Sequence, residues 1–238
     1  AKRTLSGTDN WVGYSIRIGS AYGTATGQAS HTNGGATTVT HSLGNTRAMI
    51  WLWNEAGSSR HCYMPDMASG KLMYLDTTTA ETTDAAITNV LANSFDIDTG
   101  EATGTWRWLV VTEVPGLFAM VPYTGNGSAN GPVLHAGLTP QITIMKRRDT
   151  IGNWLAYDWG RSTTNPKDDH IFIDGFNGES TDAAYAHDLI STGVKSRATG
   201  VEVNGSGGTF IGIMWGIRPF GGDGGAGAAT LCTPAKAV

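Results

Sequence analysis

The amino-acid sequence predicts an all-β protein with two tandem antiparallel β-sandwich lobes of the jelly-roll type. Charged residues make up only 15% of the 238 residues, whereas 33 are glycine and 8 are tryptophan. A soluble domain is usually about 25% charged, so this composition favours a turn-rich β protein with part of its surface covered in an assembly. Short apolar runs also alternate with turn dipeptides, and several motifs recur in the same order in the second half of the chain.

The internal repeat defines the domain organisation. Three pairs of segments are 98 residues apart, namely 83–86 with 181–184, 72–76 with 170–174, and 26–28 with 124–126. Thr40-His41 matches Leu134-His135 at 94 residues, and Gly104-Thr105-Trp106 matches Gly208-Thr209-Phe210 at 104. Such drift in spacing is expected where loops differ in length. We therefore predict an N-terminal extension over residues 1–11, one sandwich over 12–117, a second over 118–222, and a Gly-rich tail over 223–238.

The predicted elements within each copy are short strands joined by turns. Apolar runs predict strands at residues 39–43, 47–53, 106–111, 133–135, 141–146, 154–158 and 210–215. Four Asn-Gly dipeptides, at 33–34, 126–127, 177–178 and 204–205, supply the positive φ angles that tight hairpins need. Only residues 83–91 and their counterpart 181–190 look helical, as a short turn capped by Thr or Asp. The longest loops are expected at 56–69 and 161–169.

Charge and hydropathy exclude two classes of function. The formal net charge of −4 argues against a nucleic-acid binder, which needs clustered cations to neutralise phosphates. No run approaches the 18 or so apolar residues of a membrane span, so membrane insertion is not expected. The two cysteines, Cys62 and Cys232, match no metal-binding spacing, and we interpret them as free thiols. Because each copy carries few charges, we expect the two lobes to meet through an apolar, fixed interface.

The acidic motifs do not predict catalysis or metal binding. Asp98-Thr99-Gly100 matches the aspartic-protease triplet, but the second copy offers no partner carboxylate, so a hairpin turn is the better interpretation. Residues 96–101 resemble only half of a calcium loop. Asp168-Asp169-His170 is interpreted as a solvated loop end that leads into a strand. We therefore predict no catalytic, cofactor-binding or metal-binding residues, no cofactor, and no enzymatic activity.

The remaining motifs also favour structural roles. The Gly-rich segment 125–131 lacks the Lys-Ser/Thr of a phosphate loop and is interpreted as a turn between strands. His41 and His135 occupy matching places in the two copies and are interpreted as packing or turn-bonding residues. The basic clusters Arg60-His61 and Lys146-Arg147-Arg148 are interpreted as solvated strand ends.

Four tryptophans form two pairs that each share one strand face. Trp51 and Trp53 are two residues apart in one predicted strand, and Trp106 and Trp108 are two apart in another. Such pairs are usually part of a core. In a protein made of two sheets, one pair can instead face outward, toward a neighbouring molecule or a glycan.

The second copy carries a resemblance to a known family. Its motifs are Tyr123-Thr124-Gly125-Asn126-Gly127, a His-Ala-Gly-Leu turn after Leu134, Trp154-Leu155-Ala156-Tyr157, and Asn204-Gly205-Ser206-Gly207-Gly208-Thr209-Phe210. They resemble a tandem repeat domain of uncharacterised bacteriophage virion proteins, which are often tail-fibre or tail-associated chains. The first copy matches weakly, because it has Asn54-Glu55 in place of the basic pair and lacks the Trp-x-x-Tyr motif. The resemblance brings no catalytic residues with it.

The resemblance implies a structural protein of the virion, made in the host cytoplasm. The expected role is a tail-fibre or tail-tip module that mediates adhesion to the host surface. The alternative is a capsid decoration or another structural virion protein with no receptor role. The implied partners are other virion proteins and copies of the same chain, a trimer being favoured, together with a host surface glycan or protein. An adhesion function is expected on the longest loops.

Overall fold

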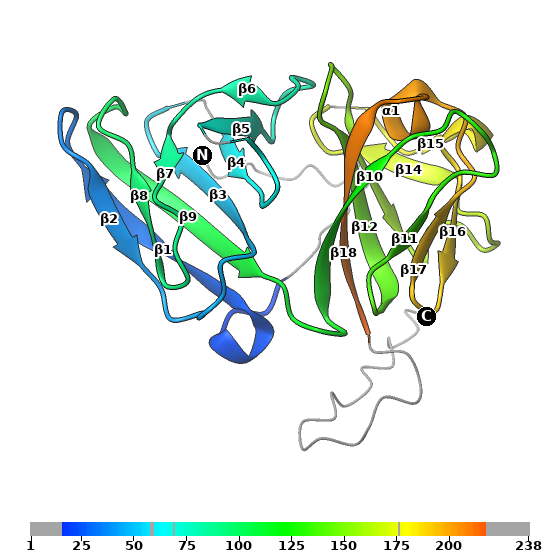
Figure 1. The fold of residues 1–238 in the computed structure, drawn as a ribbon, viewed down its shortest axis with the longest axis horizontal. Coiled ribbons are helices and arrows are strands. Elements are labelled where there is room, and N and C mark those ends of the chain that lie inside the picture. The colour runs from blue at the N-terminus through cyan, green and yellow to red at the C-terminus, as the bar shows by residue number, and fades with distance from the viewer. Residues whose placement is uncertain (1–15, 58–59, 69, 176, 218–238) are drawn as a thin grey trace, which may run out of the picture.

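The structure is a computed structural model that describes residues 16–57, 60–68, 70–175 and 177–217. Within these residues the chain forms two lobes of antiparallel strands with almost no helix, so the predicted all-β fold of two sandwich lobes is confirmed (Figure 1). The predicted N-terminal extension, the Gly-rich tail and Cys232 lie outside the described residues. None of the helices in the described ranges is long and apolar enough to cross a membrane.

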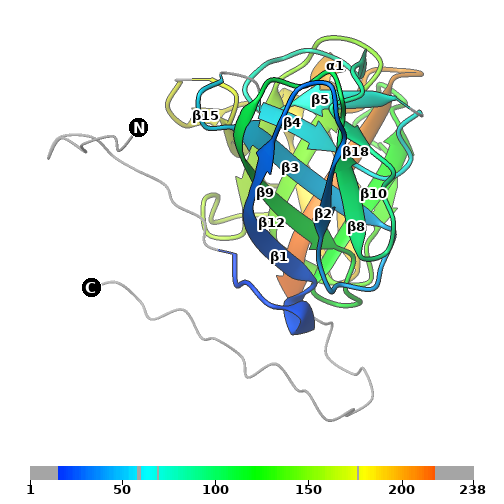
Figure 2. The same cartoon turned by 90° about the vertical axis from the view of Figure 1, so that its left-hand side faces the viewer.

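Lobe 1 contains a six-stranded and a three-stranded sheet. The six-stranded sheet has the order β1-β9-β3-β4-β5-β6, and the three-stranded sheet has the order β2-β8-β7. The bounds are β1 Thr24–His31, β2 Thr37–Thr40, β3 Ala48–Asn54, β4 Arg60–Tyr63, β5 Lys71–Tyr74, β6 Thr82–Thr83, β7 Ile87–Thr88, β8 Ser94–Ile97 and β9 Gly104–Thr112, preceded by the 3₁₀ turn Ser20–Tyr22. The three-stranded sheet lies over the outer face of the larger one (Figure 2).

Lobe 2 repeats this arrangement. Its sheets have the orders β10-β18-β12-β13-β14-β15 and β11-β17-β16. The bounds are β10 Phe118–Thr124, β11 Val133–His135, β12 Thr139–Arg147, β13 Trp154–Asp158, β14 Asp169–Phe172, β15 Ser180–Thr181, β16 His187–Ile190, β17 Gly193–Ser196 and β18 Thr209–Ile217. A 3₁₀ turn, Ala183–Tyr185, and one short helix, α1 Val201–Asn204, complete it. Each strand of lobe 1 therefore has a counterpart nine strands later.

Strand register shows which residues occupy equivalent places. Lys71 pairs with Thr83 in lobe 1, and Asp169 pairs with Thr181 in lobe 2, so this region keeps the 98-residue spacing. One alignment made from the sequence is wrong. Thr26 of β1 pairs with Leu109, in the second half of β9. Thr124 of β10 instead pairs with Thr209, the first residue of β18, which is the counterpart of β9. The first strands of the two lobes are thus related by 94 residues, the spacing already seen for Thr40-His41.

Three buried clusters divide the core into layers. The central core lies between the two six-stranded sheets, and an outer core lies between each of these sheets and its three-stranded partner. Successive residues of β3 alternate between them: Met49 belongs to the central core, and Ile50 and Leu52 belong to the outer core of lobe 1. Both faces of the six-stranded sheets are therefore covered over much of their length, which explains why β3 reads as an almost continuous apolar run.

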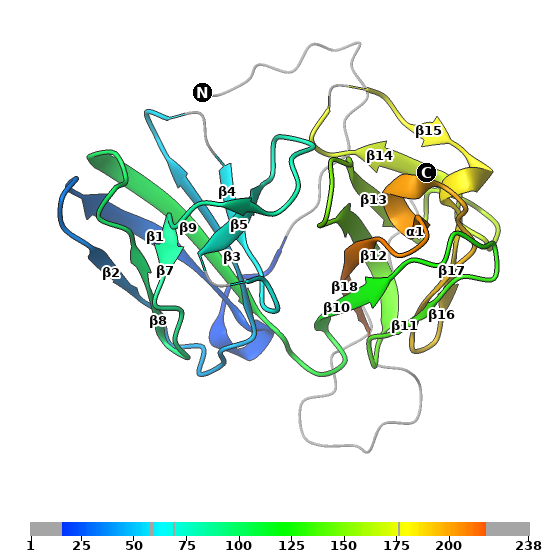
Figure 3. The ribbon, with the colours of Figure 1, turned by 45° about the horizontal axis from the view of Figure 1, so that its top comes forward.

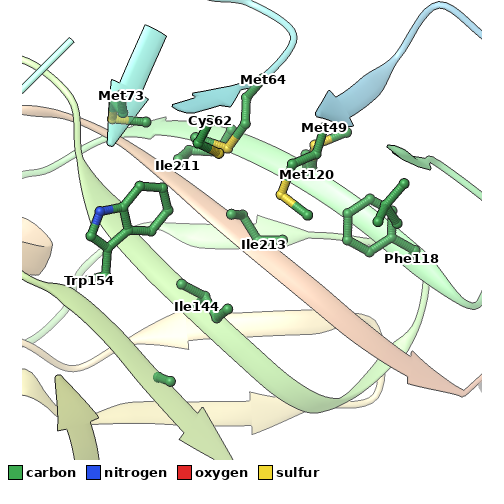
Figure 4. Close-up of a cluster of buried hydrophobic side chains, with 12 residues drawn as sticks. Met49, Cys62, Met64, Met73, Phe118, Met120, Ile144, Trp154, Ile211 and Ile213 are labelled. Atoms are coloured by element: carbon green, nitrogen blue, oxygen red, sulfur yellow. The ribbon is translucent and has the colours of Figure 1, made fainter. Parts of the chain in front are cut away.

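The central core joins the lobes through sulfur-containing side chains. Met49, Cys62, Met64 and Met73 of lobe 1 are fully buried against residues of lobe 2 (Figure 4). The lobe 2 side consists of Phe118, Met120, Ile144, Trp154, Ala156, Ile211 and Ile213. Methionine adapts its shape to irregular gaps, which suits an interface between two twisted sheets. The predicted apolar interface is confirmed, and burial raises the pKa of the Cys62 thiol above its usual range.

A polar border surrounds one side of the central core, and it contradicts the interpretation of Lys146-Arg147-Arg148 as a solvated strand end. Lys146 is completely buried, and its Nζ donates to the carbonyl oxygens of Thr78 at 3.0 Å and Gly152 at 2.6 Å. Arg148 Nε donates to Glu81 Oε1 of lobe 1 at 2.6 Å. The loop between β5 and β6 reaches across to lobe 2 here (Figure 3), and it supplies the Thr78 carbonyl to Lys146 and the Glu81 carboxylate to Arg148.

Two further local expectations are wrong. Residues 83–91 form no helix, because Asp84 accepts the N–H of Ala86 at 2.9 Å in an isolated turn and the chain then continues as β7. Only the counterpart at 181–190 contains a 3₁₀ turn, and Asp182 caps it. The segment 56–69 is not a loop throughout, because β4 lies inside it and carries the fully buried Cys62.

Candidate functional site

Most of the acidic and Gly-rich motifs occupy turns. Asp98 Oδ2 accepts the N–H of Gly100 at 3.1 Å, as a turn residue does. The Gly-rich segment 125–131 is a loop held by Asn204, whose side chain exchanges hydrogen bonds with Asn126. Asp169 accepts hydrogen bonds from the hydroxyls of Ser162 and Thr181. In the described ranges, no group of three or more His, Cys, Asp or Glu side chains is placed to hold a metal ion.

The burial of the histidines agrees with the sequence-based interpretation at some positions and contradicts it at others. His41 is buried, as expected for a packing residue, whereas His135 is exposed. Strand pairing sets His135 opposite Gly193 as Thr40 is set opposite Ser94, so the sequence match of His41 with His135 is one residue out of register. His61 is not part of a solvated strand end, because only 4% of its surface is accessible. Its ring lies 5.5 Å from that of Tyr74 and 5.8 Å from that of Trp106 between ring centroids.

His61 lies at a pocket of about 360 Å³ at one end of lobe 1. We call it the His61 pocket, and its principal side chains are Asn54, His61, Tyr74, Asp84, Glu101 and Trp106. Antiparallel pairing of β4 with β5 places His61 opposite Tyr74, so the two side chains share one face of the sheet. Pairing of β3 with β9 does the same for Asn54 and Trp106. The turns after β6 and β8 then bring Asp84 and Glu101 to these four residues.

Asp84 is the centre of the hydrogen bonding in this pocket. Its Oδ1 accepts the N–H of Ala86, and its Oδ2 accepts the hydroxyl of Tyr74 and lies 3.6 Å from His61 Nδ1. The interaction with His61, and then the bonds from Tyr74 and Ala86, lower the pKa of Asp84 to about 2. Burial and the bond to Asp84 raise the pKa of the Tyr74 hydroxyl. The pocket therefore contains an ionised carboxylate beside a neutral phenol.

Glu101 is the second carboxyl group of the pocket. Burial, together with the nearby charge of Asp84, raises its pKa above the usual value. The carbonyl oxygen of the same residue lies 3.2 Å from His31 Nε2, and His31 Nδ1 lies 2.9 Å from Thr37 Oγ1. His31 thus fixes the turn that presents Glu101. None of the described residues that line the pocket is a lysine or an arginine.

The two lobes differ at this place. Pairing of β13 with β14 sets Leu155 opposite Phe172, where lobe 1 sets His61 opposite Tyr74. Asp182 still accepts the N–H of Ala184 at 2.8 Å, as Asp84 accepts that of Ala86. The turn is therefore kept in both lobes, whereas the imidazole and phenol that face Asp84 are found in lobe 1.

A second, larger hollow of about 630 Å³ adjoins the first. We call it the Trp53 pocket, and it is lined by Thr26, Gly27, Trp53, Glu55, Arg60 and Arg107, with Asn54 shared by both pockets. Arg107 Nε donates to Glu55 Oε1 at 2.5 Å, and both of these lining side chains are exposed.

The two tryptophan pairs behave differently. Trp106 and Trp108 are buried in the outer core of lobe 1, as predicted for a core pair. The other pair is divided, because Trp51 packs against the central core while the half-buried Trp53 lines the pocket that bears its name. A strand that extends beyond the covering lobe leaves its last aromatic residue accessible.

Replacing His61 by leucine, the residue at the matching place in lobe 2, is expected to raise the pKa of Asp84 from about 2 toward the ordinary value of an aspartate. The interaction with His61 is the largest cause of the lowered value, so its loss removes most of the lowering, while the bonds from Tyr74 and Ala86 remain. Carboxyl ¹³C chemical shifts recorded as a function of pH measure this directly. A pKa that stays at about 2 in the variant would show that the hydrogen bonds from Tyr74 and Ala86 are enough to keep the pKa of Asp84 low.

One family model spans both lobes and both pockets. It is described as a domain of unknown function, DUF7483, and it matches residues 19–219. No curated protein and no solved structure matches the chain significantly.

Proposed function

The chain belongs to the DUF7483 family, a domain of unknown function, and we propose that it is a structural protein of a bacteriophage particle. In this proposal it is a tail-fibre or tail-tip module that binds the host surface. Its partners are other virion proteins, further copies of the same chain, most simply as a trimer, and a host surface glycan. The site of host binding is the pair of pockets at the end of lobe 1.

The two lobes differ in the residues at the position of the His61 pocket, and this difference is the main support for placing the binding site there. Both lobes use the same strand order, yet lobe 1 has His61 and Tyr74 where lobe 2 has Leu155 and Phe172. A polar cluster that is half-buried and absent from the sister scaffold is not required for the fold. Its presence in one lobe supports a role in recognition.

The chemistry of the two pockets suits a carbohydrate. The Trp53 ring offers an accessible aromatic face beside Arg107 and Glu55, which can hydrogen-bond sugar hydroxyl groups. The His61 pocket adds carboxyl and imidazole groups on the other side of Asn54. The two hollows share Asn54 at the end of β3 but open on opposite faces of the six-stranded sheet, so they offer two separate contact points to a branched or extended glycan.

The proposal includes no catalytic step. Asp84 is held by Tyr74 and by the N–H of Ala86, and these bonds fix the shape of the pocket. Hydrolysis of a bacterial polysaccharide by the purified protein, lost on substitution of Asp84 or Glu101, would overturn this part of the proposal.

Trp53→Ala and His61→Leu are each expected to weaken binding to bacterial surface polysaccharides by about tenfold, since each removes one principal contact of a pocket. Binding of the purified chain to a panel of immobilised polysaccharides measures the effect. His135→Ala, at an exposed position of lobe 2, is the matched control and should bind as the unmodified chain does.

The alternative role is a capsid decoration or another virion protein with no receptor role. It predicts that neither Trp53→Ala nor His61→Leu changes binding to any polysaccharide. Imaging of particles would then place the chain on the capsid rather than on the tail.

A further inference from the structure

We infer that the His61 pocket takes the ammonium-bearing ring of an amino sugar. This inference deepens the proposed function and rests on the assignment of this pocket as a ligand site. Three observations carry it: the sign of the charge in the pocket, the unsatisfied imidazole at its wall, and the kind of cation that the donor set can accept.

The charge of the pocket is negative and uncompensated by basic side chains. Asp84 is ionised, and Glu101 is the other acidic lining residue. The lining contains no lysine or arginine among the described residues, and Arg60 and Arg107 line the neighbouring Trp53 pocket instead. A ligand that brings a positive charge gains two carboxylate partners here, whereas a neutral ligand leaves Glu101 half-buried without a counterion.

The imidazole of His61 has one incompletely satisfied nitrogen, Nδ1, which faces Asp84. The residue is 4% exposed, yet its Nδ1 has no hydrogen-bond partner in the described part of the chain, and the nearest acceptor, Asp84 Oδ2, is 3.6 Å away. Buried polar nitrogen atoms are normally paired, because an unpaired one loses its hydration without compensation. Nδ1 faces Asp84, so a cation that binds Asp84 also changes the environment of the imidazole.

The donor set selects an organic cation over a metal ion. A divalent metal needs several oxygen or nitrogen ligands converging on one point, and no such group of three occurs among the described residues. An ammonium group instead donates three separate hydrogen bonds. Asp84 and Glu101 can accept two of them, and the rings of Tyr74 and Trp106, packed around His61, form an apolar wall for the sugar ring.

The test compares three sugars of similar size. D-glucosamine, N-acetyl-D-glucosamine and D-glucose are titrated into the full chain, and binding is followed by amide chemical-shift changes around residues 84 and 101. We expect D-glucosamine to bind at least about tenfold more tightly than either neutral sugar, as a charge-assisted pair predicts. Equal affinity for all three sugars, or no binding of D-glucosamine, would overturn the inference.

Three variants locate the charge. Glu101→Gln keeps the shape of the side chain and is expected to weaken D-glucosamine binding about tenfold, without affecting D-glucose. Asp84→Asn should act similarly, whereas Asp182→Asn, which alters the matching turn of lobe 2, should leave affinity unchanged. An unchanged affinity in Glu101→Gln, with the fold intact, would contradict the assignment of the ammonium site.

Failure of the proposed function is distinguishable from failure of this inference. D-glucosamine binding that depends on Glu101, in a chain that binds no bacterial polysaccharide, would support the amino-sugar site and overturn adhesion. Polysaccharide binding that His61→Leu abolishes but Glu101→Gln does not affect would support adhesion and overturn the amino-sugar site.

Discussion

Replacement of Trp154 by alanine is expected to lower the free energy of unfolding by about 3–5 kcal/mol and to destabilise both lobes together. Trp154 belongs to β13 of lobe 2, but its ring is 1% exposed within the central core that the two lobes share. Its Nε1 donates to the carbonyl oxygen of Tyr74 in lobe 1 at 2.9 Å. The ring also lies 5.6 Å from the buried Lys146 Nζ. This single substitution therefore removes apolar packing, a hydrogen bond and a cation–π contact where the two lobes meet.

Urea unfolding followed by two probes measures this effect. Tryptophan fluorescence and far-ultraviolet circular dichroism should report a single transition in the unmodified chain and in the variant. Trp154→Phe is the control, because it keeps most of the buried area and loses the bond to Tyr74, and it should cost only about 1–2 kcal/mol. Two separate transitions in the unmodified chain would show that the central core does not couple the lobes.

Replacement of His187 by isoleucine, the type of residue found at the matching place in lobe 1, is expected to remove much of the acid sensitivity of the protein. His187 is 1% exposed in lobe 2, and Ile87 occupies the equivalent position of β7. Both ring nitrogens of His187 lack a hydrogen-bond partner within the described residues. Burial, and to a smaller extent the charge of His170, lower the pKa of His187 from 6.5 to about 3.

The sign of the pH dependence follows from these values. Below pH 6.5 the unfolded chain binds a proton at His187, while the folded chain resists it until about pH 3. The unfolded state therefore binds more protons in this interval, and stability falls as the pH drops from 6.5 to 3. The loss from this group is on the order of 4 kcal/mol across the whole interval. Above pH 6.5 His187 is neutral in both the folded and the unfolded state, so it no longer makes the stability depend on pH.

Stability curves measured at several pH values test this expectation. The difference in unfolding free energy between His187→Ile and the unmodified chain should grow in favour of the variant as the pH falls from 6.5 to 3. Taking the difference cancels the other acidic groups, including Asp84, whose lowered pKa adds its own loss at the acid end. His135→Ile is the exposed control and should leave the curve unchanged. A difference independent of pH would mean that His187 has the same pKa in the folded and the unfolded chain.

Several strands could be predicted because their side-chain pattern is local. The apolar run 47–53 became β3, Ala48–Asn54, and the run 154–158 became β13 without any change of bounds. The runs 106–111 and 210–215 became the longer strands β9 and β18, which are counterparts in the two lobes. Hydrophobicity and β-branched or aromatic residues determine such elements through the two-residue period of the strand.

The His61 pocket could not be predicted, because its members are brought together by pairing. His61 and Tyr74 are thirteen positions apart and meet only when β4 pairs with β5. Asp84 and Glu101 come from turns that sequence patterns describe as solvent-exposed. One signal was present in the sequence: Asp84 and Asp182 match between the copies, so the residues around them can be compared lobe by lobe once the register is known.

The sequence by itself determined the fold class, the repeated order of motifs and the apolar character of the surface between the lobes. These depend on composition and on short-range patterns, which local backbone geometry imposes. Only the tertiary structure decided which part of the chain packs against each face of each strand. Lys146 is buried because a loop of lobe 1 covers it, and Trp53 is accessible because lobe 2 does not reach it. Burial is set by what packs against a residue from elsewhere in the chain, and no local pattern contains that information.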